Sequence, residues 1–299
     1  MRILVTAGSG LTGAAFRKLA TTKYSNHEFL FHTRSNGDLS KPYVFKFLLT
    51  DFKPDVIIHN ASMLHGSFAS EKSIETSKKT NTEIFGNLLK ELLPHQQVYC
   101  LSSYHIFANP APFDILDLES LNRNTSYALE KSNQIESSRS FPNVKFVILP
   151  HLFGEHDNFS PGRAHFIANS IRRIVTAKER QDAQIEFFGS VQRILQFSTA
   201  ELATNFVLDA VFSNLETKEK YFLANVGWKR TCLEVFMNIC GIVGFQGLVI
   251  PVNSDSKTFE RNMYFPTNTN SGDVDKLAFL ASLGTAIDYF KRGEIEYVD

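Results

Sequence analysis

The chain has 299 residues, enough for one large or two modest domains with a substantial core. Its 31 Lys and Arg residues balance its 31 Asp and Glu residues, so no global field recruits nucleic acid or an anionic membrane. Three cysteines show neither metal-site nor disulfide spacing, which favours a reducing compartment, and no apolar run has the length of a membrane span. The sequence therefore predicts a cytoplasmic protein with no metal site.

Short apolar segments alternate with helical patterns through residue 150. Strands are expected at 2–6, 29–33, 55–59, 98–103 and 144–149. Helices are expected between them at 14–20, 44–51, 81–93 and 127–140, with a polar segment at 71–79 leading into the third. This alternation predicts an α/β fold with a Rossmann-type, doubly wound parallel sheet. We assign residues 1–150 to a dinucleotide-binding domain.

The character of the chain changes after residue 150. Loops are expected at 151–162 and 257–271, and short strands at 185–188, 195–198, 221–226 and 248–252. Helices are expected at 201–211, 231–240 and 273–290, and a further helix carries His165 and Arg173. Residues 151–299 are therefore interpreted as a smaller, mixed α/β substrate-binding lobe.

A glycine-rich loop separates the first expected strand from the first expected helix. The candidate cofactor-binding residues of this loop are Ala7, Gly8, Ser9, Gly10, Leu11 and Gly13. Glycine lets the backbone approach a pyrophosphate, which then lies at the positive end of the helix. Tight turns use glycine as well. Ala7 stands where such loops usually begin with glycine, and alanine fits there if its φ is negative.

The ends of the second and third expected strands carry further cofactor candidates. Arg34 follows the second strand, where an acidic residue would hold the ribose hydroxyls of NAD and arginine suits the extra phosphate of NADP. We therefore expect NADP(H), with a solvated arginine as the alternative. Asp38 and Leu39 begin the next connection. The third strand ends in Asn60, Ala61 and Ser62, at the sheet edge where ligands gather, although Asn60 also suits a turn or a cap.

Tyr127 and Lys131 form the candidate catalytic pair. On a helix, residues four apart lie on the same face, so the phenol and the ammonium would reach one pocket. A neighbouring cation favours the ionised phenol, which would let Tyr127 exchange protons near neutral pH. Ser103 ends the fourth expected strand, and its hydroxyl would hold a substrate carbonyl. Surface helices also carry such Tyr/Lys pairs.

Together these residues resemble the extended short-chain dehydrogenase/reductase family, and within it the epimerase-reductases of GDP-4-keto-6-deoxymannose. The most specific stretches are Gly154–Phe159, Arg163–His165, Phe188–Ser190 and Gln196–Phe197. The resemblance implies NADPH as cofactor, a GDP-linked ketosugar as substrate and a homodimer. It also implies that Tyr127 protonates the C4 oxygen while Lys131 holds the nicotinamide ribose, and that Pro150 lies beside the nicotinamide.

The resemblance further implies a cysteine and a histidine that move protons at C3 and C5. His165 falls on the histidine, whereas His105 stands at the cysteine position. Imidazole can serve as acid or base, so His105 either transfers protons or only hydrogen-bonds in the pocket. Leu195 replaces an expected substrate arginine, and the neighbouring Arg193 is the candidate to compensate. The segment from Pro150 to Gly154 is one residue shorter than in the family.

Asn158 and Arg173 complete the expected substrate contacts. Asn158 lies in the Gly154–Phe159 stretch, and Arg173 matches an arginine suited to the diphosphate, because a guanidinium pairs with phosphate oxygens. A solvated helix face would also explain Arg173. Three functions stay open: reduction with C3/C5 epimerisation, reduction alone, and a non-catalytic cofactor-binding regulatory protein.

Overall fold

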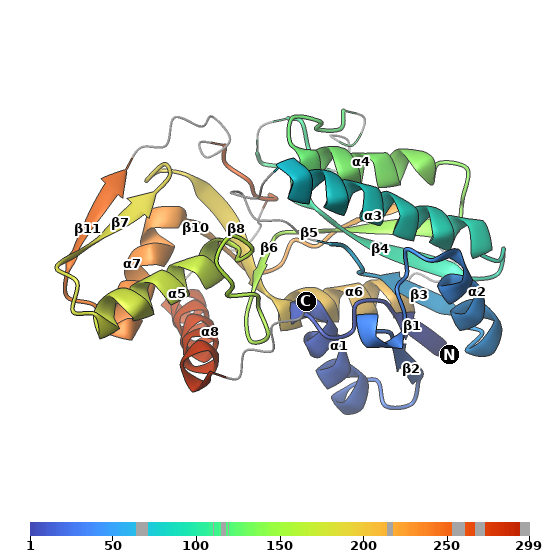
Figure 1. Cartoon of the computed structure of the whole chain (residues 1–299), viewed down its shortest axis with the longest axis horizontal. Helices are drawn as coiled ribbons and strands as arrows, with labels where there is room; N and C mark the ends of the chain where they lie inside the picture. The colour runs from blue at the N-terminus through green and yellow to red at the C-terminus, as the bar shows by residue number, and fades with distance from the viewer. Residues whose placement is uncertain are drawn as a thin grey trace.

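The computed structural model describes residues 1–63, 71–109, 111–114, 118, 120–213, 218–252, 261–266 and 273–293. Figure 1 shows two lobes, one built on a broad sheet and one on smaller sheets and helices. No helix within the described ranges is long and apolar enough to cross a bilayer.

A six-stranded sheet in the order β2-β1-β3-β4-β5-β9 forms the larger lobe. Its strands are β1 (Arg2–Val5), β2 (Glu28–Phe31), β3 (Val56–His59), β4 (Gln97–Ser103), β5 (Val144–Leu149) and β9 (Tyr221–Leu223). All its pairings are parallel, so the predicted Rossmann-type sheet is confirmed.

Helices cover both faces of this sheet (Figure 1). One face carries α2 (Pro42–Asp51), α3 (Glu71–Glu91) and α4 (Ser126–Ser137), and the other carries α1 (Leu11–Thr22) and α6 (Ala200–Ser213). Side chains alternate along each strand, so Leu4 packs into the core under α2 and α3 while Val5 packs against α1 and α6. Burial on both faces explains why these strands are continuously apolar.

The order of the strands reverses next to β1. The chain runs from β1 to β2 on one side and then crosses to β3 on the other. Open α/β sheets bind ligands at the carboxyl ends of strands beside such a reversal. The glycine loop after β1 and Asn60 after β3 both lie at this place.

The smaller lobe holds two further sheets. A three-stranded sheet has the order β10-β8-β6, and a two-stranded sheet pairs β11 with β7. The strands are β6 (His151–Phe153), β7 (Gln184–Phe188), β8 (Ile194–Thr199), β10 (Trp228–Thr231) and β11 (Leu248–Val252). The helices α5 (Phe166–Glu179), α7 (Cys232–Val243) and α8 (Asp273–Arg292) pack on one another beside them.

The chain returns to the larger lobe after residue 199. Helix α6 packs on α1, and β9 pairs with β5 through Phe146 and Tyr221. Both elements follow residue 150, so the expected division of the chain there does not account for this return. A long-range pairing of this kind leaves no local pattern in the sequence.

Several expected local elements differ in the structure. Residues 151–153 form β6 instead of a loop, because they pair with β8, and β10 at 228–231 was not predicted. Helix α3 begins at Glu71, so the polar segment 71–79 is helical. His165 is the residue before α5 rather than a member of the helix. Part of the expected loop at 257–271 lies outside the described residues; of the rest, Met263 bridges to Leu195 of β8 and is buried.

Candidate active site

The glycine loop is shaped by close backbone contacts between β1 and α1. The Gly8 N–H donates to the His32 carbonyl at 2.8 Å, and the Gly8 carbonyl accepts from Arg17 Nε at 2.8 Å. A Cβ on Gly13 would meet the Gly8 carbonyl carbon at 2.4 Å. Helix α1 starts after Gly10 with no side-chain cap and no acidic residue in its first turn. Its N-terminal N–H groups therefore favour an anion such as a phosphate.

Ala7 does not meet the condition under which alanine fits this position. Its φ is +56°, in the left-handed region that favours glycine, instead of negative. The turn from β1 into the loop requires this conformation, and the chain places alanine there at a cost of about 1–2 kcal/mol. Leu11 and Ser9, like Ala7, stay partly exposed at the loop surface.

The segment after β2 separates its three candidates. Arg34 and Asp38 are exposed, and the Asp38 carboxylate accepts the Ser40 N–H at 2.9 Å. That hydrogen bond, with help from Lys41 and Arg34, lowers the pKa of Asp38. Leu39 is only 6% exposed and packs in the core beneath α2 and α3. Of the three candidates, Arg34 is thus the exposed cation.

Thr6 organises the end of β3. Its hydroxyl accepts the backbone N–H groups of Asn60 and Ala61, each at 2.9 Å, and lies 3.3 Å from His59 Nδ1. The Asn60 amide also reaches the Ala7 carbonyl at 3.5 Å. These bonds join the loop after β3 to the glycine loop. The three candidates at 60–62 and the glycine loop therefore share one edge of the sheet.

Ser103, Tyr127 and Lys131 gather where β4 ends. Tyr127 lies in the first turn of α4, which Thr125 caps by accepting the Ala128 N–H at 3.2 Å. A hydrogen bond joins the Tyr127 phenol to Ser103, and the Lys131 ammonium lies 6.0 Å from the centre of the Tyr127 ring. Lys131 is 6% exposed and donates to the Leu101 carbonyl at 3.4 Å.

The electrostatics of this pair differ from the expectation. Burial raises the pKa of Tyr127 above its usual range, the Glu130 carboxylate raises it further, and the bond to Ser103 opposes them. Burial also lowers the pKa of Lys131, which the charge of Glu130 opposes. Desolvation thus outweighs the pairing on which the prediction of an easily ionised phenol rested. A phenol held protonated is a proton donor.

Three histidines and Arg193 lie near the Ser103–Tyr127–Lys131 group. The His105 ring meets the Tyr127 ring edge-on at 5.6 Å between centroids. Burial, with smaller contributions from Arg193, His165 and Arg261, lowers the pKa of His105 to about 3. His105 is therefore neutral at pH 7, and its surroundings oppose its protonation. His165 is among the groups that act electrostatically on His105, so the two imidazoles are neighbours, and their roles in proton transfer stay a prediction.

His151 lies near His165 and His105 but was not among the site residues predicted from the sequence. Its ring lies 5.6 Å from the His165 ring, and its Nε2 is buried with no hydrogen-bond partner among the described residues. The nearby His165, His105 and Arg193 all add to the lowering of its pKa by burial. Its place after Pro150, at the end of the strand that pairs with Ser103, was the available signal. Pro150 itself is buried between β5 and β6.

The expected substrate contacts do not all lie near these histidines. Arg193 acts electrostatically on His105 and His151, and its Nε donates to the Arg261 carbonyl at 3.0 Å. Arg173 instead joins α5 to β7, because it donates to the Glu186 carbonyl at 2.6 Å and lies 4.8 Å over the Phe188 ring. Asn158 is exposed, and its side chain accepts the Ser160 N–H at 2.9 Å.

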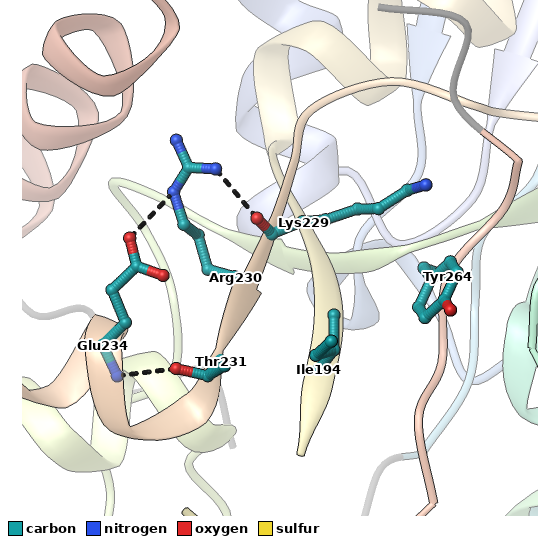
Figure 2. A pocket seen from close by; sticks show the side chains of 6 residues that line it. All are labelled: Ile194, Lys229, Arg230, Thr231, Glu234 and Tyr264. Carbon is teal, nitrogen blue, oxygen red and sulfur yellow. Dashed lines mark hydrogen bonds and ion pairs between the residues drawn. The ribbon is translucent and has the colours of Figure 1, made fainter. Parts of the chain in front are cut away.

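A separate cavity of about 270 Å³ opens in the smaller lobe. Figure 2 shows its lining by Ile194, Lys229, Arg230, Thr231, Glu234 and Tyr264. Arg230 pairs with Glu234 at 3.2 Å, and the Lys229 ammonium lies 4.6 Å from the centre of the Tyr264 ring. None of the predicted site residues lines it. Within the described ranges, no group of three His, Cys, Asp or Glu side chains is placed to hold a metal.

The parallel sheet and the glycine loop at its reversal point, with the Ser/Tyr/Lys group nearby, define the class of NAD(P)-dependent oxidoreductases with a Rossmann-type domain. The chain belongs to the NAD dependent epimerase/dehydratase family, whose model matches residues 3–227. This confirms the predicted family and an NAD(P)-dependent enzyme.

Characterised relatives extend over most of the chain. It is 26% identical over 263 residues to a GDP-L-colitose synthase of Yersinia pseudotuberculosis, covering 84% of each chain. It is 30% identical over 220 residues to a GDP-L-fucose synthase of Dictyostelium discoideum, covering 69% of this chain and 68% of the other. A GDP-L-fucose synthetase from Naegleria fowleri bound to NADP has a similar fold, with a TM-score of 0.80 and 20% identity over 98% of this chain and 93% of that chain.

Proposed function

We propose that the protein reduces the C4 ketone of a GDP-linked 4-keto-6-deoxyhexose with NADPH. The names of the relatives, which act on GDP-linked sugars, support nucleotide-sugar reduction. The observation that carries the proposal is the Ser103–Tyr127–Lys131 group, in which burial keeps the Tyr127 phenol protonated. Reduction of a ketone to an alcohol needs such a proton donor.

The roles of the residues follow from their places. NADPH, when bound, supplies the hydride that adds to C4. Tyr127 donates its proton to the C4 oxygen as the negative charge develops there, so that the carbonyl becomes a hydroxyl group. Ser103 holds the same oxygen by a hydrogen bond, and the Lys131 ammonium stabilises the phenolate left on Tyr127. Solvent then returns the proton to Tyr127.

Arg34 supports NADPH over NADH. It is exposed shortly after the end of β2, where an acidic residue would favour NADH. The similar structure from Naegleria fowleri contains NADP. The loop before α1, with Gly8, Gly10 and Gly13, is the proposed seat of the pyrophosphate. Asn60, Ala61 and Pro150 are proposed to line the nicotinamide side.

Epimerisation at C3 and C5 is the second part of the proposal. The C4 ketone makes the hydrogens on both neighbouring carbons acidic, so a base can remove them and an acid on the other face can return a proton. His105 is neutral and lies against Tyr127, and His165 lies beside His151. We assign these two imidazoles to the proton transfers, with Arg193 holding the diphosphate side of the substrate.

A simple 4-ketoreductase is the alternative that one observation favours. The His105 ring is packed edge-on against Tyr127, and this contact limits its reach towards C3 or C5. A non-catalytic regulatory protein would be indicated only by cofactor binding without turnover. We also propose that the protein is a homodimer and lies in the cytoplasm. Light scattering of the purified protein measures its oligomeric state.

The decisive experiment is reaction with GDP-4-keto-6-deoxymannose and NADPH in heavy water. NADPH oxidation with deuterium at C3 and C5 of the product supports the epimerase-reductase, and the variants H105Q and H165Q should each reduce the exchange. Reduction without deuterium selects the ketoreductase. The Y127F variant should bind NADPH as the wild type does but lose about 10²–10⁴-fold in rate. If none of the nucleotide 4-ketosugars tested supports NADPH oxidation, the proposal is contradicted.

A further inference from the structure

A buried carboxylate stands next to the catalytic pair. Glu130 precedes Lys131 on α4 and is only 5% exposed. One of its oxygens accepts from Asn81 Nδ2 of α3 at 2.8 Å, and the other accepts from the Ser62 hydroxyl at 3.4 Å. A buried carboxylate is costly without such donors and a nearby positive charge.

Asn81 extends this contact to the loop after β3. Asn81 is 2% exposed, and its side chain forms two hydrogen bonds with the backbone of Met63. Oδ1 accepts the Met63 N–H at 2.6 Å, and Nδ2 donates to the Met63 carbonyl at 3.0 Å. The carboxylate of Glu130 thus joins three elements: helix α4, helix α3 and the loop at residues 60–63.

We propose that Glu130 is a positioning residue of the reductase: it anchors the catalytic helix to the cofactor side of the sheet and balances the buried ammonium of Lys131. This role rests on the proposed function for its catalytic consequence, but not for its structural one. Its effect on chemistry passes through Tyr127 and Lys131, and its carboxylate oxygens accept hydrogen bonds from Asn81 and Ser62.

The charge of Glu130 keeps the catalytic pair protonated before the reaction. It raises the pKa of Tyr127, so the phenol enters the reaction with its proton, and it opposes the loss of the proton from Lys131. Other groups around Tyr127 are the Ser103 hydroxyl, the His105 ring and the buried Tyr104 phenol. Cys100 and the neutral His59 lie near Lys131. Among the named groups, Glu130 supplies the negative charge.

The test compares E130Q with wild type in NADPH oxidation from pH 6 to 11. Glutamine keeps an oxygen for Asn81 and removes the charge. We expect the alkaline fall of kcat that follows deprotonation of Lys131 to move down by about one pH unit, because burial already lowers the pKa of Lys131 and Glu130 opposes this, with the Kd of NADPH changed less than about threefold. The matched control is E136Q, which removes a partly exposed carboxylate from the same helix, paired with Arg123. The catalytic part of the proposal is overturned if the alkaline limb of E130Q stays within about 0.2 pH unit of wild type, which is the error of such profiles. It is also overturned if the limb moves equally in E136Q.

A second measurement needs no substrate. The Tm losses of E130Q, K131M and the double variant form a cycle, and we expect the double variant to lose less than the sum of the single losses, because each single variant leaves one buried charge uncompensated. Additive losses would overturn the charge balance. If wild type reduces no ketosugar while the cycle shows coupling, the proposed function fails and the structural role of Glu130 stands.

Discussion

The hydroxyl of Thr6 accepts the backbone N–H of Asn60 at 2.9 Å across the reversal point of the sheet. The same oxygen accepts the N–H of Ala61, so one buried side chain fixes the start of the loop after β3. A hydroxyl has two acceptor sites and one donor, and His59 Nδ1 at 3.3 Å is placed to take the donor.

We predict that T6V lowers the free energy of unfolding by about 1–3 kcal/mol, because two buried N–H groups lose their acceptor in a side chain of nearly the same shape. NADPH binding should weaken as well, since Asn60 and the glycine loop would no longer be held together. Urea unfolding and a fluorescence titration measure both quantities. T6S keeps the hydroxyl and serves as control; equal losses in both variants would show that the methyl group matters instead.

Gly13 and Gly10 should respond very differently to alanine. A Cβ on Gly13 would overlap the Ala7 carbonyl and the Gly8 backbone at 2.4–2.7 Å, whereas a Cβ on Gly10 meets nothing within 4 Å. We expect G13A to lower stability by about 2–3 kcal/mol and G10A to leave the Tm of the cofactor-free protein unchanged. Thermal melting measures this. A G13A protein as stable as G10A would mean that the loop relaxes without cost.

Ala7 offers a stabilising substitution. Its φ of +56° costs alanine about 1–2 kcal/mol, and glycine avoids this cost while adding freedom to the unfolded chain. A7G should therefore raise the free energy of unfolding by about 0.5–1 kcal/mol. Chemical denaturation with unchanged m-value is the measurement. A loss of stability would show that the αL conformation at residue 7 is not the one the protein adopts.

Stability should depend on pH through His59. Burial lowers the pKa of His59 to about 3, with Lys131 adding to the effect. Between this value and the usual ~6.5 the unfolded chain binds a proton that the folded protein does not, so stability is complete above pH 6.5 and falls as the pH drops towards 3. H59N keeps an acceptor for Thr6 without titrating. Its stability should fall less steeply, by up to about 1.4 kcal/mol per pH unit, in unfolding curves from pH 4 to 6.

The two candidate phosphate arginines should separate by their effects. Arg193 lies near His105, whereas Arg173 contacts the Glu186 carbonyl and the Phe188 ring between α5 and β7. We expect R193M to raise the KM of the ketosugar at least about tenfold, the scale of one lost charge-assisted hydrogen bond. R173M should chiefly lower the Tm. Steady-state kinetics and melting of both variants decide; a KM effect confined to R173M would reverse the assignment.

Local patterns predicted those parts of the site that local chemistry sets. The apolar runs before Ala7, Asn60 and Ser103 marked strands whose carboxyl ends meet at one edge, because parallel strands share a direction. The four-residue spacing of Tyr127 and Lys131 placed both on one face of α4. Residue type alone led to the prediction that Arg34 faces a phosphate, and this stays a prediction.

Long-range packing set the rest. Desolvation of Tyr127 and His105 depends on which residues surround them, so the rise of one pKa and the fall of the other were not readable from neighbours in the chain. The position of His151 is set by the pairing of residues 151–153 with β8, in which His151 pairs with Phe197, 46 positions later in the chain.

The sequence by itself determined the Rossmann-type sheet, its glycine loop and the residue types at the candidate site, because alternating patterns and strand ends are local properties. Only the tertiary structure decided that β9 returns to the sheet, that Arg173 serves packing, and that Glu130 meets Asn81 and Ser62. These are contacts between segments far apart in the chain, and their energies arise from burial and charge in an interior that exists only once the chain has folded.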